Sequence, residues 1–327
     1  MPLLLSINWN SCLLDVKTWM SASKLKLNPD KTGFILFGSK QHREKLKGCF
    51  PIDILGNPLH PSESVRNLGV WFDSDFSFSK HVQNVCRSCF IQLRDFRRIC
   101  QYLTHNAAIL VANAFVSSRL DYCNSLFRSL SKSNLQKLQC IQNSAARIIT
   151  NSSRYSHITP LMKQLHWLPV RFRSEFKTAT LVYKFLQTGT PNYFTAQLSS
   201  YSNSYNTRHS QSGATFLTVP KFQPSIHKSA KQFGFSFAFD APTVWNSLPE
   251  DVRLSPNVAS FRRKLKTYLL YTKAFHLNPL AHPVSPWCGP PSVPGLWYCS
   301  SLIVLLRLRV YFWVEIKCYK SQIRISG

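Results

Sequence analysis

Acidic residues are scarce in this sequence, and their scarcity gives the first indication of function. The 327 residues include 14 Asp and Glu against 40 Lys and Arg, which leaves a formal net charge of +26 with histidine neutral. Between Asp121 and Asp240 the only acid is Glu175, although Lys and Arg recur throughout that stretch. A solvated helix face usually carries charges of both signs, whereas a field of one sign concentrates polyanions. The composition therefore predicts a protein that binds nucleic acid by electrostatics.

Other absences exclude several classes of protein. The sequence has no GxSxG, GxGxxG or P-loop motif, which argues against an α/β-hydrolase, a Rossmann protein and a Walker-type NTPase. No apolar run reaches the ~18 residues that span a bilayer; the nearest, 300–316, contains Arg307 and Arg309. The first ten residues lack the basic segment of a signal peptide. We therefore expect the ten cysteines to be free thiols in an intracellular protein, cytoplasmic or nuclear, that is not secreted.

Hydrophobic periodicity predicts an α+β fold that is mostly α. A helix is expected over 9–23, followed by three short antiparallel strands over 33–38, 50–56 and 65–73. Apolar residues then recur at intervals of three and four residues. This spacing predicts a bundle of three helices over 76–103, 105–127 and 134–150. Thr104 and Ser133 are candidate caps of the second and third helices, and Gly189 is the expected end of a later helix.

Two short motifs each have two interpretations. Asp73 and Asp75 flank a serine and could hold Mg²⁺, but acids before a long helix also fit a helix N-terminus. Cys86 and Cys89 form a CxxC pair with His81 nearby, which is half of a zinc site. Both cysteines also fit the apolar stripe of the helix. We favour the helix start and the buried thiols.

The basic middle of the chain is the main candidate for binding. It interleaves Arg171, Arg173, Lys177 and Lys184 with five aromatic residues. Cations for phosphates and aromatic rings for bases suit a sequence-tolerant binder of single strands or hybrids. Alternatively, the aromatic residues belong to the core and the cations to the surface. The aromatic residues are Tyr155, Trp167, Phe172, Phe176 and Tyr183.

Six strings between residues 9 and 275 carry a family resemblance. Together and in this order, they closely resemble the C-terminal third of the reverse transcriptase polyprotein of LINE-type (non-LTR) retrotransposons. The strings are "WMSASKLKLNPDKTGFILFGS", "VRNLGVWFDSDFSFSKHV", "AFVSSRLDYCNSLF", "LQKLQCIQNSAARIIT", "HITPLMKQLHWLPVRFR" and "FAFDAPTVWNSLPEDVR" with its following "FRRKLKTYLL".

The resemblance implies the end of a right-hand polymerase. Lys31, between Asn28 and Thr32, would be the remnant of a lysine that faces the phosphates of the incoming nucleotide, and Leu68 and Gly69 would belong to the primer grip. The implied division is a truncated palm over 1–78, a helical thumb over 79–150 that holds the template–primer duplex, a basic C-terminal region over 151–277 and a low-order tail over 278–327. The implied nucleic-acid-binding residues are Lys31, Leu68, Gly69, Arg147, Arg171, Arg173, Lys177 and Lys184.

The departures from the family pattern predict that catalysis is lost. In the family an Asp-Asp hairpin precedes the Trp19 string and helps bind the two Mg²⁺ ions of nucleotidyl transfer. Met1 stands too close to Trp19 for that hairpin, no Asp-Asp pair occurs, and Gly33 replaces a residue that is often acidic. We expect no metal, no cofactor, no small-molecule substrate and no membrane, only residual binding of RNA, DNA or a hybrid. The alternative is a non-functional, partly folded product of a decayed retroelement.

Overall fold

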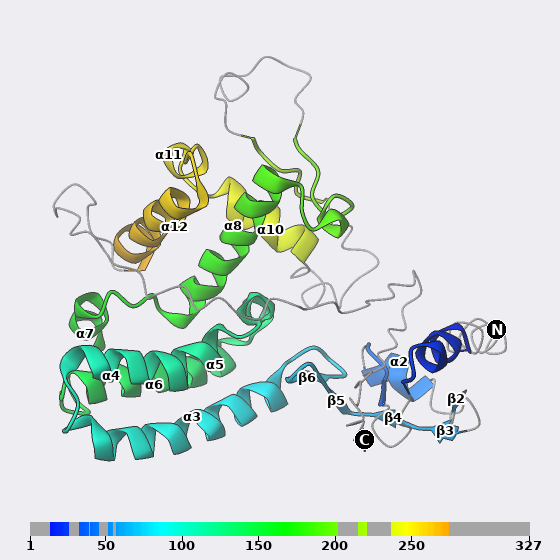
Figure 1. Ribbon diagram of the computed structural model, residues 1–327, viewed down its shortest axis with the longest axis horizontal. Coiled ribbons are helices and arrows are strands. Elements are labelled where there is room, and N and C mark those ends of the chain that lie inside the picture. Colours follow the sequence, from blue (N-terminus) through cyan, green and yellow to red (C-terminus); the bar gives the residue numbers. More distant parts are fainter. Residues whose placement is uncertain are drawn as a thin grey trace, which may run out of the picture. The chain divides into compact units, whose positions relative to one another are not determined.

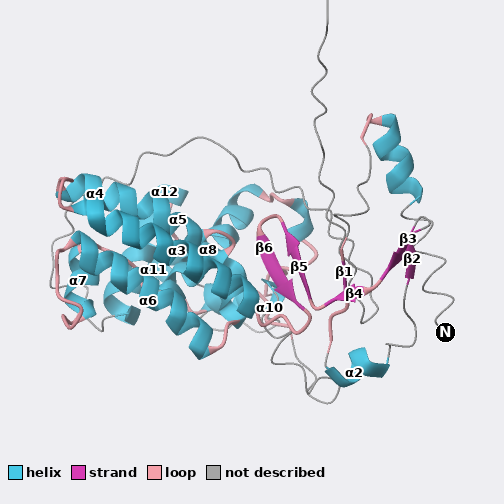
Figure 2. Cartoon of the chain, turned by 90° about the horizontal axis from the view of Figure 1, so that it is seen from below, coloured by secondary structure: helices cyan, strands magenta, loops and turns pink. Residues whose placement is uncertain are grey.

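The chain forms two compact units, which are described separately. The computed structural model describes residues 14–25, 33–38, 40–45, 52–54, 57–201, 215–220 and 237–274. The first unit contains the described residues up to His81, and the second contains those from Val82 to Ala274. The predicted tail, 278–327, lies outside the described residues. Helices dominate the described part of the chain and the strands are few and short, so the prediction of a mostly α fold is confirmed (Figures 1 and 2).

The first unit contains three two-stranded ladders among its described residues. Residues 14–22 are helical, and a short helix, α2 (Lys40–Lys45), follows the first strand. A small apolar cluster of Ile35, Phe37 and Val65 holds the unit together, and the rings of Phe37 and Phe76 stack with centroids 4.1 Å apart. The ladders are β1 (Phe34–Ile35) with β4 (Pro61–Ser62) in parallel, β2 (Ile52–Ile54) with β3 (Asn57–Leu59) antiparallel, and β5 (Ser64–Asn67) with β6 (Val70–Asp73) antiparallel.

These ladders correct the expected three antiparallel strands. The run 65–73 is a hairpin rather than one strand, because Leu68 and Gly69 turn the chain between β5 and β6 with φ of 44° and 86°. Positive φ at both central residues is the requirement of a type I′ turn, whose twist matches the flanking strands. Within the run 33–38, Phe34–Ile35 pairs in parallel with Pro61–Ser62. The connection of about 25 residues between them is long enough for the crossover that a parallel pair needs.

The second unit is built from helices. Its first, α3 (Ser79–Cys100), begins just before the unit boundary and is followed by the expected second and third helices of the bundle. The second helix consists of three consecutive segments over 105–121, so it ends earlier than the predicted residue 127; Cys123, just after it, has φ of 51°. The remaining elements are α4 (His105–Ala112), η3 (Asn113–Ser117), α5 (Ser118–Asp121), η4 (Asn124–Ser129), α6 (Lys132–Ile149), α7 (Ile158–Gln164), α8 (Val170–Thr188), η5 (Asn192–Phe194), α10 (Phe237–Asn246), α11 (Glu250–Arg253), α12 (Val258–Thr267) and η7 (Tyr268–Ala274).

The predicted helix ends are correct at two positions of three. The Thr104 hydroxyl accepts from the Ala107 N–H at 3.3 Å and so caps α4. Gly189 ends α8 with φ of 66°, and its N–H donates to the Phe185 carbonyl at 2.8 Å. The cap of α6 is Ser131 rather than Ser133, because the helix begins two residues earlier than expected.

Two apolar cores lie within the second unit and meet at α8. The first gathers side chains of α3 to α7, and the second gathers side chains of α8, α10 and α12. Gln139 and Gln142 of α6 join them, because the Gln139 side chain accepts from the Val170 N–H at 2.9 Å and Gln142 donates to the Leu168 carbonyl at 2.8 Å. A side chain of α6 thus accepts a hydrogen bond from the first N–H of α8, which has no partner within its own helix. The described part of the chain contains no helix that is long and apolar enough to cross a bilayer.

Candidate nucleic-acid interface

Asp73 and Asp75 lie at the start of α3, as the helix-start interpretation predicts. Asp73 accepts from the Ser77 hydroxyl at 2.9 Å and from the Lys80 N–H at 3.4 Å. Asp75 accepts from the Ser77 N–H at 3.2 Å. Asp73 therefore accepts from a backbone N–H of the first turn of α3, and Asp75 accepts from one in the loop that leads into the helix. Among the residues that the structure describes, no group of three or more His, Cys, Asp or Glu is placed to hold a metal ion.

The CxxC pair belongs to the core of the helical unit. Cys89 is fully buried and Cys86 half-buried, and both are free thiols. Burial raises the pKa of the Cys89 thiol to about 11, although the nearby charge of Arg119 opposes the shift. A thiol with so high a pKa is a poor metal ligand and nucleophile at neutral pH. The interpretation as small buried side chains is confirmed.

The predicted polymerase residues of the first unit are partly visible. Lys31, with Asn28 and Thr32, lies outside the described residues. Leu68 and Gly69 form the exposed tip of the β5–β6 hairpin, with Leu68 47% exposed. A leucine at positive φ on an exposed turn is unusual, and apolar contact with a ligand is one use of such a side chain.

In the helical unit, two of the predicted binding arginines make internal contacts. Arg147 donates to the Ser156 carbonyl at 3.1 Å and so fixes the loop after α6. Arg173 contacts Asp121 at 2.7 Å and donates to the Leu168 carbonyl at 3.0 Å, with only 12% of its side chain exposed. Arg171 and Lys184 are exposed, whereas Lys177 is half-buried. The exposed cations of α8 are therefore Arg171 and Lys184.

The aromatic residues of the basic middle are divided between core and surface. Trp167 and Tyr183 are buried, and the Tyr183 hydroxyl donates to the Ser255 carbonyl at 2.6 Å. Tyr155 is 79% exposed, and the Arg154 guanidinium lies 4.7 Å from its ring centroid. The core interpretation is confirmed for the two buried rings, and Tyr155 remains available for stacking.

Glu175 and Asp240, two of the few acids near the basic middle of the chain, form buried ion pairs. Arg128 of η4 contacts Glu175 of α8 at 2.8 Å and Asp240 of α10 at 2.9 Å, and both acids are 8% exposed. Lys273 approaches Glu175 at 3.5 Å. Burial raises the pKa of Asp240, and the Arg128 charge and hydrogen bond oppose this effect. These contacts join the two cores of the unit.

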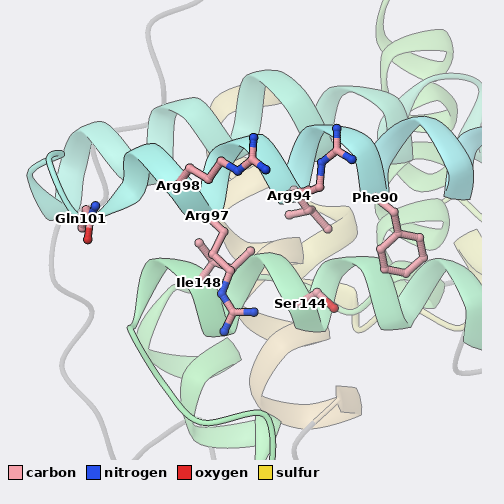
Figure 3. A pocket seen from close by; sticks show the side chains of 8 residues that line it. Phe90, Arg94, Arg97, Arg98, Gln101, Ser144 and Ile148 are labelled. Atoms are coloured by element: carbon pink, nitrogen blue, oxygen red, sulfur yellow. The ribbon is translucent and has the colours of Figure 1, made fainter.

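A groove between α3 and α6 is the site that the sequence reasoning missed. It has a volume of about 540 Å³ and carries three arginines of α3 together with the 48% exposed ring of Phe90 (Figure 3). Figure 3 shows Phe90 and Arg97 reaching from α3 toward α6. No acid lines it; Asp95 contacts Arg94 at 3.4 Å, but both side chains are largely exposed. The lining residues are Phe90, Leu93, Arg94, Arg97, Arg98, Gln101, Ser144 and Ile148.

A signal for this groove is present in the sequence. Phe90, Arg94, Arg97 and Arg98 are spaced by four, three and one, so they share one side of a helix. What the spacing cannot give is the facing helix, since Ser144 and Ile148 lie some 50 residues further along the chain. A guanidinium fork binds phosphate in two-point contacts, and an exposed ring stacks on a base. The groove thus combines the two contacts that single strands require.

Comparison with known proteins gives one informative similarity. The chain is 26% identical over 157 residues to the "Probable RNA-directed DNA polymerase from transposon BS" of Drosophila melanogaster. The similarity covers 47% of this chain and 17% of the length of that protein. No family model and no solved structure matches the chain. The chain therefore contains a region with weak homology to a transposon polymerase, in agreement with the reverse transcriptase resemblance of its motifs.

Proposed function

We propose that this chain is a fragment of a non-LTR retrotransposon reverse transcriptase that retains nucleic-acid binding and not polymerisation. In this proposal residues 79–150 are the thumb of a right-hand polymerase, and the hairpin tip at Leu68 and Gly69 is its primer grip. The distant similarity to a transposon polymerase supports the family assignment. The excess of positive charge, +26 over the whole sequence, supports the class of ligand.

The α3–α6 groove carries the binding proposal. Arg94, Arg97 and Arg98 lie within about one turn of α3, and the exposed ring of Phe90 lies one turn before Arg94. The groove lining contains no carboxylate that would repel phosphate. Because these contacts go to the backbone and to the face of any base, binding is expected to show little sequence preference.

Polymerisation is excluded from the proposal by the chemistry of phosphoryl transfer. Positioned carboxylates and metal ions supply nearly all of that catalysis. The sequence contains no pair of adjacent aspartates, and Asp73 and Asp75 are engaged at the start of α3. Primer extension on an RNA template with Mg²⁺ should give no product, and extension above a heat-inactivated control would contradict this part of the proposal.

The salt dependence of binding tests the electrostatic part. Each neutralised phosphate of a single strand contributes about −0.7 to the slope of log K against log salt. Fluorescence anisotropy with a labelled 20-nucleotide DNA and the matching RNA should give a steep negative slope and similar affinities for unrelated sequences. Binding that is absent at about 50 mM salt, or independent of salt, would support the alternative of an inert product.

Charge substitutions locate the binding surface. The variant R94Q/R97Q/R98Q should lower affinity at about 50 mM salt by roughly 10- to 100-fold and reduce the slope by about 2, since three phosphate contacts are lost. The control K17Q/K132Q/R263Q removes the same charge from three exposed positions outside the groove. Equal weakening by both variants would mean that binding follows net charge and that the groove is not the site.

The Phe90 ring separates stacking from charge. Stacking of a base on an aromatic side chain contributes about 1–3 kcal/mol, so F90A should lower affinity by at least about fivefold and leave the salt slope unchanged. F90L retains most of the apolar surface but no aromatic face, and should bind like F90A. If F90L binds like the unmodified chain, Phe90 serves packing and not stacking.

A further inference from the structure

A second cluster of cations lies where α8 and α12 pack together. Arg173, Lys177 and Lys184 share one side of α8, because they are separated by four and seven residues. Arg262 and Lys266 are one turn apart on α12, which contacts α8. We call these five residues the α8–α12 seam. Nothing in the sequence pattern joins the two sets, which are about 80 residues apart.

Arg262 of α12 reaches across the seam to α8. The Arg262 guanidinium lies 5.8 Å from the ring centroid of Phe176, the neighbour of Lys177 on α8. Burial lowers the pKa of Lys177; Asp121 opposes that shift, and the charges of Lys184 and Arg262 add to it.

Lys266 is the most strongly affected member. Burial and, after it, the charge of Arg173 lower the Lys266 pKa to about 8. His166 also faces Lys266, and burial together with the Lys266 charge lowers the His166 pKa. Arg173 thus disfavours the charged form of Lys266, and Lys266 disfavours the charged form of His166.

The acid beside the seam is already engaged. In the described part of the chain, Asp121 is the carboxylate that acts on Lys177, and it contacts Arg173 at 2.7 Å. Like charges one turn apart destabilise a helix, and the arrangement repeats on both helices. An anion placed over the seam would remove this repulsion on α8 and α12 at once.

We infer that the α8–α12 seam is a second anion-binding site and takes successive phosphate groups of a nucleic-acid strand. From Arg173 to Lys184 the stripe extends about 16 Å along α8, which is longer than a single small phosphate compound. Lys and Arg bind phosphate oxygens through charge-assisted hydrogen bonds. The inference takes its class of ligand, nucleic acid, from the proposed function. The location of the site does not depend on that proposal.

The first test compares two neighbouring arginines of α12 in the full chain. R262Q should weaken binding of a labelled 20-nucleotide DNA by about 3- to 10-fold at roughly 50 mM salt and lower the salt slope by about 0.7. R263Q removes the same charge from an exposed position on a different side of the helix, and should change affinity by less than about twofold. Equal effects of R262Q and R263Q would overturn the inference.

The second test uses the proton of Lys266. A phosphate group near Lys266 favours its charged form, so binding of the DNA at about pH 8.5 should take up a proton. Titration calorimetry in two buffers of different ionisation enthalpy measures that uptake, and K266Q should abolish it. No uptake by the unmodified chain, or the same uptake by K266Q, would overturn the inference.

Two comparisons separate this inference from the others. If R94Q/R97Q/R98Q binds like the unmodified chain while R262Q is weakened, the groove proposal fails and the seam stands. If inorganic phosphate or pyrophosphate at low millimolar concentration displaces the DNA from R94Q/R97Q/R98Q, and raises its Tm as much as the DNA does, the seam is a site for free phosphate and the strand is not its ligand.

Discussion

Two charge clusters occupy opposite sides of α8, and they differ in sign balance. On one side Glu175 contacts Arg128, which also contacts Asp240, so that buried charges of both signs meet. On the other side Arg173 contacts Asp121, while Arg262 of α12 acts on Lys177 and Arg173 acts on Lys266 of α12, so that cations outnumber acids. Residues two apart on a helix point to different sides. Glu175 therefore lies away from Arg173 and Lys177, although it stands between them in the sequence.

The difference distinguishes buried ion pairs that stabilise the fold from cations that we propose to bind a ligand. A buried pair lowers the cost of burial for both members, and removing one leaves the other without compensation. A cluster in which cations outnumber acids keeps part of its repulsion, and an anion that binds there removes it. We therefore assign Arg128, Glu175 and Asp240 to stability, whereas binding at the α8–α12 seam is our proposal.

The largest effect is expected from breaking the balanced cluster. R128A should lower the free energy of unfolding by about 3–5 kcal/mol, because it leaves two buried carboxylates without their arginine. R171A is the control, since Arg171 lies 3.9 Å from the same Glu175 but is 68% exposed, and should cost less than about 1 kcal/mol. Urea denaturation measures both. Neutralising the carboxylates in R128A/E175Q/D240N should restore most of the loss.

The pH dependence of R128A provides a check on the mechanism. The Arg128 charge opposes the rise of the Asp240 pKa that burial causes, so R128A raises that pKa further. An acid whose pKa is higher in the folded state stabilises the fold at low pH and loses this contribution as the pH rises through the folded pKa. R128A should therefore be closest to the unmodified chain near pH 4 and fall behind by pH 8. A constant difference would mean that packing, not charge, is lost.

A gain in stability of intermediate size is expected from the seam. The Lys266 pKa is about 8, below its ordinary 10.5, so the unfolded chain binds more protons between these values and stability rises with pH across them. K266Q should raise the free energy of unfolding at pH 7 by on the order of 2 kcal/mol. It should also remove the increase of stability with pH. K264Q, an exposed lysine on the same helix, should keep it. A loss of stability in K266Q would show that Lys266 packs as a structural residue.

The smallest effect is expected from the acid beside the seam. D121N removes the carboxylate that contacts Arg173 and acts on Lys177. The net positive charge of the seam then increases, and affinity for single-stranded DNA should rise by about two- to threefold at low salt. The cost in stability should stay below about 1 kcal/mol, because the Asp121 side chain is 45% exposed. Weaker binding by D121N would contradict this expectation and would mean that Asp121 holds Arg173 in the position that binds the ligand.

Local features were predictable from the sequence where one element alone decides them. The cap at Thr104, the end of α8 at Gly189 and the burial of Cys89 follow from neighbours within one or two turns. The hairpin turn at Leu68 and Gly69 was missed, because a leucine is not a usual residue for positive φ. The prediction of Ser133 as the cap of α6 is wrong, because serine is common near helix starts and its propensity does not fix which position begins the helix; the structure places the cap at Ser131.

The sequence by itself determined the excess of positive charge, the change from strand to helix near residue 79 and the resemblance of the chain to a transposon reverse transcriptase. Only the tertiary structure decided which cations are neutralised. Arg128 meets its carboxylates 47 and 112 residues away, and Arg173 meets Asp121 at a separation of 52. Such pairs depend on how the helices pack, whereas composition and periodicity record only neighbours along the chain.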